Sequence, residues 1–366
     1  MHKLFEILGK RKVEGDVGIE VECEGANLVR VEEKNWHTED DGSLRPVGGF
    51  PSLKCEWVLD RPIPVNEVQA SLTYLAKRQE KATLNFGFRT SVHVHVNCQD
   101  LTYYQLLNMV YIYFLYEEPL INFCGEGRKA NRFCLRVRDA EGQLEAIQEL
   151  MQWGEVGLLK MRPDRTRYSA LNLEALPKYG SLEFRGMRGT LDVPTLLSWV
   201  NMCVSIREAA KQYPDIEAVH EAFVKMGSEA FGKQVFGKEL KKLENVEEGA
   251  ALGYSLSLDI PYAFKESKKQ PYKEYKQPPK PEYKRAKVEA AQYVPPPPRQ
   301  PRNPIDADLM GVDLPEIVDG VGFAEWQEQL WKKVQEAREQ VIAAPAPKRK
   351  PRIADLIILD DLEEIE

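Results

Sequence analysis

Three short segments of this chain alternate between apolar and polar residues, a period that a β-strand produces and a helix does not. In each segment one row of side chains suits a core and the other row carries polar groups. Segments with helical spacing lie between and after them, and the two kinds of element are interspersed over residues 1 to about 215. The predicted strands are residues 17–23, 92–97 and 181–185, and the predicted helices are residues 65–81, 102–116, 140–153 and 193–213, with a further helical region at 217–236.

Proline divides the chain into a part that can fold compactly and a part that cannot. Of the 24 prolines, 11 lie between Pro261 and Pro304, and this span carries eight lysines and three arginines against four glutamates. Such a composition favours an extended, solvated spacer. We therefore expect a catalytic domain over residues 1–255, a disordered linker rich in Lys, Pro and Tyr over 256–305, and a tail over 306–366. The tail is predicted to hold a short amphipathic helix at about 323–343 and an acidic end.

The charge and the cysteines narrow the class of protein. The net charge is −7, and because the proline-rich span contributes +7, the rest of the chain sums to −14. A core with this negative charge is not expected to bind nucleic acid. The six cysteines form no CxxC pair and the start of the chain resembles no export signal, so reduced thiols in a cytosol are expected. The longest apolar stretch, residues 106–121, is interrupted by polar residues, and no membrane span is predicted.

The first predicted strand places several carboxylates on one face. In residues 18–24 the period of two puts Glu20, Glu22 and Glu24 opposite an apolar row. Same-face neighbours stand about 7 Å apart, so these charges repel one another unless cations compensate them. Carboxylate oxygens suit a hard cation such as magnesium. A strand with a solvated acidic face is the alternative interpretation.

The second and third predicted strands add bases to this pattern. His93, His95 and Asn97 share one face of the second strand, and Glu183 and Arg185 share one face of the third. Two histidines make zinc the usual metal, and hydrogen-bonded core histidines are the alternative. A mixed Glu and His face beside a guanidinium fits a metal-bound polyphosphate. The sequence has no GxxxxGK[ST] phosphate loop.

Taken in order, the motifs GIEVE, HVHVN and LEFR resemble those of the amidoligase family of phage and bacterial proteins. This family is a branch of the glutamine synthetase and glutamate-cysteine ligase superfamily of carboxylate-amine ligases. The resemblance covers about residues 13–215 and extends to Trp36 and to residues 41–44, 55–58, 131–134 and 168–172. It implies an α+β fold with a glutamine synthetase-like antiparallel sheet, a half-barrel, as the active site with packed helices.

The resemblance also implies an activity and its cofactors. ATP and two or more magnesium ions would convert a carboxylate into an acyl phosphate, which an amine attacks to form an amide. The substrates would be a carboxylate and an amine, either small or attached to a protein, in the cytoplasm of a bacterium or a phage-infected host cell. The tail offers a docking site for a protein partner. Two alternatives stay open, an inactive scaffold that recruits partners through its tail and a Glu/His metal-dependent hydrolase.

Carried over position by position, the resemblance implies a role for each site residue. Glu20 would share one ion with His93 and Glu183, while Glu22 and Glu56 would hold the ion nearer the acid substrate. Departures at Cys55, where the family has a small glycine, and at residues 60–62 put the amino-acid pocket in doubt. The remaining implied contacts are catalytic roles for Arg185, Arg132 and His95, nucleotide contacts for His95, Arg185, Asn172 and Asn97, and a general substrate contact for Asp41.

Overall fold

The computed structural model describes residues 2–44, 53–159 and 167–269. The chain divides into two units, Met1–Gln277 and Pro278–Glu366. Everything described below belongs to the first unit. The tail over 306–366, its amphipathic helix and all but the first part of the linker lie outside the described residues.

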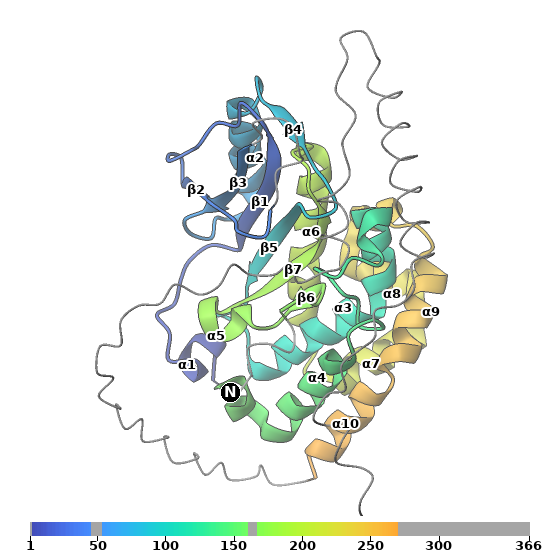
Figure 1. Ribbon diagram of the computed structural model, residues 1–366. Helices are drawn as coiled ribbons and strands as arrows, with labels where there is room; N and C mark the ends of the chain where they lie inside the picture. Colours follow the sequence, from blue (N-terminus) through green and yellow to red (C-terminus); the bar gives the residue numbers. More distant parts are fainter. Residues whose placement is uncertain (1, 45–52, 160–166, 270–366) are drawn as a thin grey trace, which may run out of the picture. The chain divides into compact units, whose positions relative to one another are not determined.

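The described chain forms an α+β fold around one open antiparallel sheet (Figure 1). The strand order is β2-β3-β1-β5-β7-β6, and β4 pairs separately with β1. Strands β1, β5 and β7, which contain the three segments predicted from their alternation, are neighbours at the centre. The strands are β1 (Val17–Ala26), β2 (Trp36–Glu39), β3 (Leu53–Leu59), β4 (Thr83–Asn85), β5 (Ser91–Asn97), β6 (Leu171–Asn172) and β7 (Ser181–Arg188).

The register of these strands brings their polar residues into adjacent rows. Glu20 of β1 lies opposite His93 of β5, and His95 of β5 lies opposite Glu183 of β7. Glu22 lies opposite Glu56 of β3. Because side chains alternate between faces, the predicted polar rows all point to the same side of the sheet.

The apolar face of the sheet is covered by two long helices, α3 (Tyr103–Cys124) and α6 (Val193–Ala210). Phe184 of β7 packs against both helices. The centre of its ring lies 5.5 Å from the ring centre of Tyr113 on α3 and 6.3 Å from that of Trp199 on α6. All three side chains are almost completely buried. This packing contributes the hydrophobic stability of the fold and leaves the other face of the sheet for chemistry.

The helices follow the predicted spacing with two main differences. Helix α3 continues through Pro119 to Cys124, beyond the predicted end, and Glu117 within it is buried and accepts a hydrogen bond from the Val137 backbone. The predicted helical region at 217–236 is two helices that meet at Gly227, whose positive φ of 79° suits glycine. The other helices that fall in predicted helical regions are α2 (Val65–Arg78), α4 (Glu141–Trp153), α7 (Ile216–Met226) and α8 (Ser228–Phe236).

The packed chain also extends further than the limit expected near residue 255. That limit falls inside α9 (Val246–Ser257), and α10 (Asp259–Ser267) follows at once. Ile260 and Phe264 of α10 are buried in the same core as the sheet. The remaining short elements are α1 (Leu4–Ile7), α5 (Ala175–Tyr179), and the 3-10 helices η1 (Glu126–Arg128), η2 (Gly154–Leu159) and η3 (Gly237–Lys242).

Across the described residues, every helix is either too short or too polar to cross a lipid bilayer.

Candidate active site

The polar face of the sheet forms the floor of a cavity of about 850 Å³, a size suited to a small-molecule substrate or cofactor. Strands β1, β3, β5 and β7 contribute the floor, and α5 and the segment around Phe133 contribute walls. Among the described lining residues, the carboxyl groups are Glu20, Glu22, Glu39, Asp41, Glu56, Glu174 and Glu183, and the cationic groups are Arg89, Arg167, Lys178 and Arg185.

Glu20 is the central acid of this floor. Its Oε2 lies 3.0 Å from Nδ1 of His93, and its Oε1 lies 3.2 Å from Nε2 of His95. Burial by itself would raise the pKa of Glu20, but the hydrogen bonds and positive charge of the two histidines outweigh it and hold the pKa well below its usual value. The same contact raises the pKa of His95 against the opposing effect of its burial. The two histidine contacts therefore favour the ionised form of Glu20.

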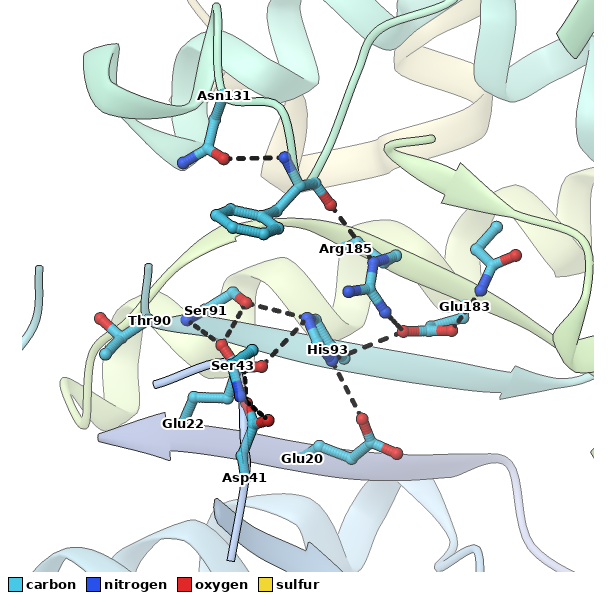
Figure 2. Close-up of polar contacts among 12 residues, drawn as sticks. Glu20, Glu22, Asp41, Ser43, Thr90, Ser91, His93, Asn131, Glu183 and Arg185 are labelled. Atoms are coloured by element: carbon cyan, nitrogen blue, oxygen red, sulfur yellow. Dashed lines mark hydrogen bonds and ion pairs between the residues drawn. The ribbon is translucent and has the colours of Figure 1, made fainter. Parts of the chain in front are cut away.

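Glu183 is a second buried acid, held from three sides (Figure 2). Its Oε1 forms an ion pair with Arg185 and lies 3.5 Å from Nδ1 of His93, and its Oε2 accepts a hydrogen bond of 2.7 Å from Asn172. Burial opposes ionisation of Glu183, but the charges of His93 and Arg185 prevail and lower its pKa. This places a guanidinium beside a carboxylate on the cavity floor, as the sequence predicted.

The side chain and the backbone of Arg185 are both held by hydrogen bonds to neighbouring residues. Its Nε donates to the Phe133 carbonyl at 3.4 Å. The buried side chain of Arg128 supports the backbone at this point, because Nη2 donates to the Arg185 carbonyl at 2.8 Å and Nε donates to the Gly186 carbonyl at 2.9 Å. Arg128 thus fixes the backbone from which the guanidinium of Arg185 projects.

Glu22 of β1 and Glu56 of β3 form the other acidic part of the floor. Glu22 is buried, and its Oε2 accepts hydrogen bonds from the backbone N–H of Ser91 at 2.8 Å and from the Ser91 hydroxyl at 2.6 Å. Glu56 lies directly across from Glu22. Burial, together with the negative charges of Glu20 and Glu22, raises the pKa of Glu56 to about 9. The acids on this side of the cavity therefore repel one another when all are ionised, and a bound cation would relieve that repulsion in place of the proton on Glu56.

The residues present fit a hard or borderline cation. Two sets of three residues could each hold a cation, because each residue offers one ligand atom within 4.8 Å of the others. The sets are Glu20, Glu56 and His93, and Glu20, His95 and Glu183. The family resemblance implied a different grouping, with Glu22 joined to Glu56, and Glu20 joined to His93 and Glu183. In the structure Glu20 is common to both groups, and Glu22 is occupied by Ser91. Carboxylates with imidazole suit magnesium, manganese or zinc.

Several lining residues come from loops and helix α5, where no strand period could predict them. Cations lie over aromatic rings here, with Arg89 5.6 Å from the centre of the Phe133 ring and Lys178 4.5 Å from that of Tyr179. Arg167 lies 5.8 Å from the ring centre of Tyr168, which also lines the cavity. Such pairs leave cationic groups close to aromatic faces, an arrangement that can bind anions and planar rings.

Two predicted residues are not brought to the cavity. Asn97, predicted to contact the nucleotide, donates from Nδ2 to the carbonyls of Val13 at 3.0 Å and Gly15 at 2.8 Å, and so fastens the segment that leads into β1. Arg132 is exposed, and its guanidinium lies 5.0 Å from the ring centre of Phe133, the neighbour that lines the cavity in its place. The other two, Asp41 and Asn172, do line it.

Ser91 is the polar residue of the floor that sequence reasoning missed. It joins Glu22 to His93, with its Oγ 2.8 Å from His93 Nε2 (Figure 2). A signal for it was present in the sequence, because Ser91 stands two residues before His93 and the period of two carries the polar row one step further toward the start of β5.

A comparison with protein families gives an independent identification of this region. The model of the family described as "Putative amidoligase enzyme" matches residues 54–207. The matched range holds Glu56, the two histidines of β5 and the Glu183–Arg185 pair, while Glu20 and Glu22 precede it. No curated protein matches the chain. The resemblance to the amidoligase family is thereby confirmed, and the description of that family names a ligase-type enzyme.

Proposed function

Because residues 54–207 match the amidoligase family, we propose that the protein is an ATP-dependent carboxylate-amine ligase that uses two or more magnesium ions. The observation that carries this proposal is the arrangement of Glu20 between His93 and His95, next to the Glu183–Arg185 pair, on the floor of one cavity. The open antiparallel sheet with its polar face fits a glutamine synthetase-like half-barrel, which we propose as the fold.

The charges of the cavity suit a reaction between two anions. A substrate carboxylate must approach the terminal phosphate of ATP, so both negative charges need compensation. Glu20, Glu56, Glu183 and the two histidines would hold magnesium, which would offset the charge of the polyphosphate when bound. Arg185 supplies a fixed guanidinium whose planar fork matches phosphate oxygens. The cations at the rim, Arg89, Arg167 and Lys178, supply further positive charge.

The proposed reaction has two steps. A carboxylate oxygen of the acid substrate forms a bond to the terminal phosphorus of ATP, and the bond from that phosphorus to the ADP oxygen breaks. The amine nitrogen then attacks the carbonyl carbon of the acyl phosphate, loses a proton and forms the amide, while inorganic phosphate leaves. These steps need positioning and electrostatic stabilisation but no protein nucleophile. In agreement, all six cysteines are buried and none is among the described lining residues.

The proposal is tested with the full chain and its site variants. We expect Mg-ATP to bind, and ADP release to rise only when both an acid and an amine from a substrate panel are present. Glu20→Gln and Glu183→Gln should each lower that turnover by about 10²–10³-fold, the range for loss of one preorganised electrostatic partner. Glu80→Gln, an exposed acid at the end of α2, is the matched control and should leave turnover unchanged.

Binding is measured by calorimetry and turnover by coupled ADP detection, with thermal unfolding as the check that each variant is folded. Absence of Mg-ATP binding, or equal binding by wild type and both site variants, would refute the ligase. Zinc-dependent hydrolysis of an amide without nucleotide would identify a Glu/His metal-dependent hydrolase. Mg-ATP binding without turnover on any acid and amine pair would favour the inactive scaffold.

A further inference from the structure

We propose that four side chains beside the cavity form a docking surface for an acidic polypeptide. Arg89 and Phe133 line the cavity, whereas Phe88 and Arg132 lie outside its lining and are exposed. We call these four side chains the mouth stack. The binding of a peptide to the mouth stack does not depend on the proposed function. Only the use of one peptide carboxylate as the acid substrate rests on that function.

Guanidinium groups and aromatic rings alternate in the mouth stack. The guanidinium carbon of Arg132 lies 5.0 Å from the ring centre of Phe133, and that of Arg89 lies 5.6 Å from the same centre. Arg89 also lies 5.2 Å from the ring centre of Phe88. All three distances are within the range of about 6 Å over which a cation is attracted to an aromatic ring. The rings therefore hold two guanidinium groups near each other at the side of the cavity.

Asn131 joins the two segments that supply the mouth stack. Its Nδ2 donates to the carbonyl of Phe88 at 2.7 Å, and its Oδ1 accepts from the backbone N–H of Phe133 at 3.0 Å (Figure 2). The side chain of Asn131 is buried, so these hydrogen bonds are shielded from water. A surface that is ordered before binding loses less conformational entropy when a partner docks. The mouth stack is in this sense prepared for a ligand.

The charges of the mouth stack call for a partner with carboxylates. Within residues 2–44, 53–159 and 167–269, no carboxylate forms an ion pair with Arg89 or Arg132. The planar fork of a guanidinium matches a carboxylate, which it can bind through two parallel hydrogen bonds. Phe88 adds apolar surface, since its side chain is 65% exposed. An acidic peptide offers both the carboxylates and the aliphatic carbon that these groups would contact.

The position of the mouth stack favours a polypeptide over a small molecule. A ligand confined to the cavity can contact Arg89 and Phe133, but the exposed Phe88 and Arg132 lie outside the lining. An extended polypeptide advances by about 3.3 Å per residue, and every second side chain points to the same side. A few residues of such a chain would reach from the cavity to the exposed members, with alternate carboxylates directed at the guanidinium groups.

Single-stranded nucleic acid fits the mouth stack less well. It binds by stacking its bases on free aromatic faces along a positively charged groove. Two guanidinium groups already lie against the ring of Phe133. Carboxyl groups also outnumber cationic groups among the described residues of the adjoining cavity, and they would repel a chain with a phosphate at every nucleotide. A peptide can place neutral residues there instead.

The test is the binding of a fluorescein-labelled peptide of alternating Glu and Gly to the full chain, followed by fluorescence anisotropy. Arg132→Ala should raise the Kd about three- to fivefold, the upper range for one exposed ion pair. The combined change Arg89→Ala and Arg132→Ala should raise it about tenfold or more. Lys225→Ala, which removes an exposed cation from α7, is the matched control and should leave the Kd unchanged.

Two further variants separate the geometry of the mouth stack from its charge. Arg132→Lys keeps the positive charge without the planar fork, so it should recover only part of the affinity that Arg132→Ala loses. Phe88→Ala changes no charge but removes one ring beside Arg89, and should raise the Kd about two- to fivefold. Thermal unfolding checks that each variant is folded. A peptide of alternating Gln and Gly should not bind, because it lacks the carboxylates.

The outcomes separate this inference from the proposed function. The lysines and arginines between Pro261 and Pro304 could also attract an acidic peptide, but binding there would be the same in the Arg89→Ala and Arg132→Ala double variant, and that result would overturn the proposal. Tighter binding of an oligothymidylate of equal length, or complete displacement of the peptide by Mg-ATP, would overturn it as well. Peptide binding that requires the mouth stack in a protein that binds no Mg-ATP would refute the ligase but support the docking surface.

Discussion

The two faces of the central sheet, one packed against helices and the other lining the cavity, are held in opposite ways. Along β7, Leu182 and Phe184 are completely buried against the helices, while Glu183, 5% exposed, and Arg185 face the cavity. On the first face stability comes from the area of apolar contact, to which any well-shaped side chain can contribute. On the second, each charge depends on a particular partner. Neighbouring residues of one strand therefore separate folding from chemistry, and substitutions can test that separation.

The largest effect is expected on the apolar face. Phe184→Ala should lower the free energy of unfolding by about 3–5 kcal/mol, because it removes a buried ring that contacts Tyr113 and Trp199 and leaves a cavity. Urea unfolding measures the change. Tyr262→Ala, which truncates a side chain that is 69% exposed, is the control and should change stability by less than about 0.5 kcal/mol. Equal losses in the two variants would refute this view of the apolar face.

An effect of similar size, but dependent on pH, is expected from an acid that lies on the helix side of the sheet. Glu117 of α3 is buried, and burial raises its pKa from 4.5 to about 8 even though the Val137 N–H donates to it. The folded state therefore retains a proton that the unfolded state has lost between these pH values. Folding stability should fall as pH rises through this interval, with a contribution of up to about 1.4 kcal/mol per pH unit.

This prediction is measured by urea unfolding at several pH values between 5 and 8. Glu117→Gln, which cannot ionise, should give a flatter dependence of stability on pH. Glu118→Gln is the matched control, because Glu118 is paired with Arg136 at 3.1 Å, and the steeper dependence should persist in it. A Glu117→Gln variant that follows the wild-type curve would show that Glu117 ionises in the folded protein as it does in the unfolded chain.

The smallest effect compares two adjacent residues of β1. Ile19→Val removes one buried methyl group from the apolar face and should cost about 0.5–1.5 kcal/mol of stability. Its neighbour Glu20 faces the cavity, so Mg-ATP binding and ADP release by Ile19→Val should equal those of the wild type. Loss of nucleotide binding in this variant, with the fold intact, would mean that the two faces are coupled more closely than their packing indicates.

Much of the sheet was predictable because its central strands bury one face under helices and turn the other toward a polar cavity. In β1, β5 and β7 the alternation of Ile19 with Glu20, Val94 with His93, and Phe184 with Glu183 follows directly from one apolar and one polar face. Strand β6 has only two residues, Leu171 and Asn172, which is too short to show a period. Its pairing with β7 depends on tertiary contacts that spacing does not encode.

The same reasoning explains which site residues were found. The acids and histidines lie on strands, where period two determines the face of each side chain, although not which of them meet at one ion. Arg89, Arg167 and Lys178 come from outside the strands, where spacing carries no direction. The motif around Arg132 identified the correct loop, but Phe133 is the residue that lines the cavity. At Asn97 the polar row continues, yet the strand ends there and its amide binds backbone instead.

The buried guanidinium of Arg128 has a consequence for assembly. Strand β6 pairs only with Phe184 and Glu183 of β7. The next carbonyls of β7, those of Arg185 and Gly186, could accept hydrogen bonds from a strand of another molecule if no side chain bound them. Arg128 occupies both of them with a side chain. The two carbonyls next to the side chain of Arg185 are thus already bonded within the chain and are not available to a strand from another molecule.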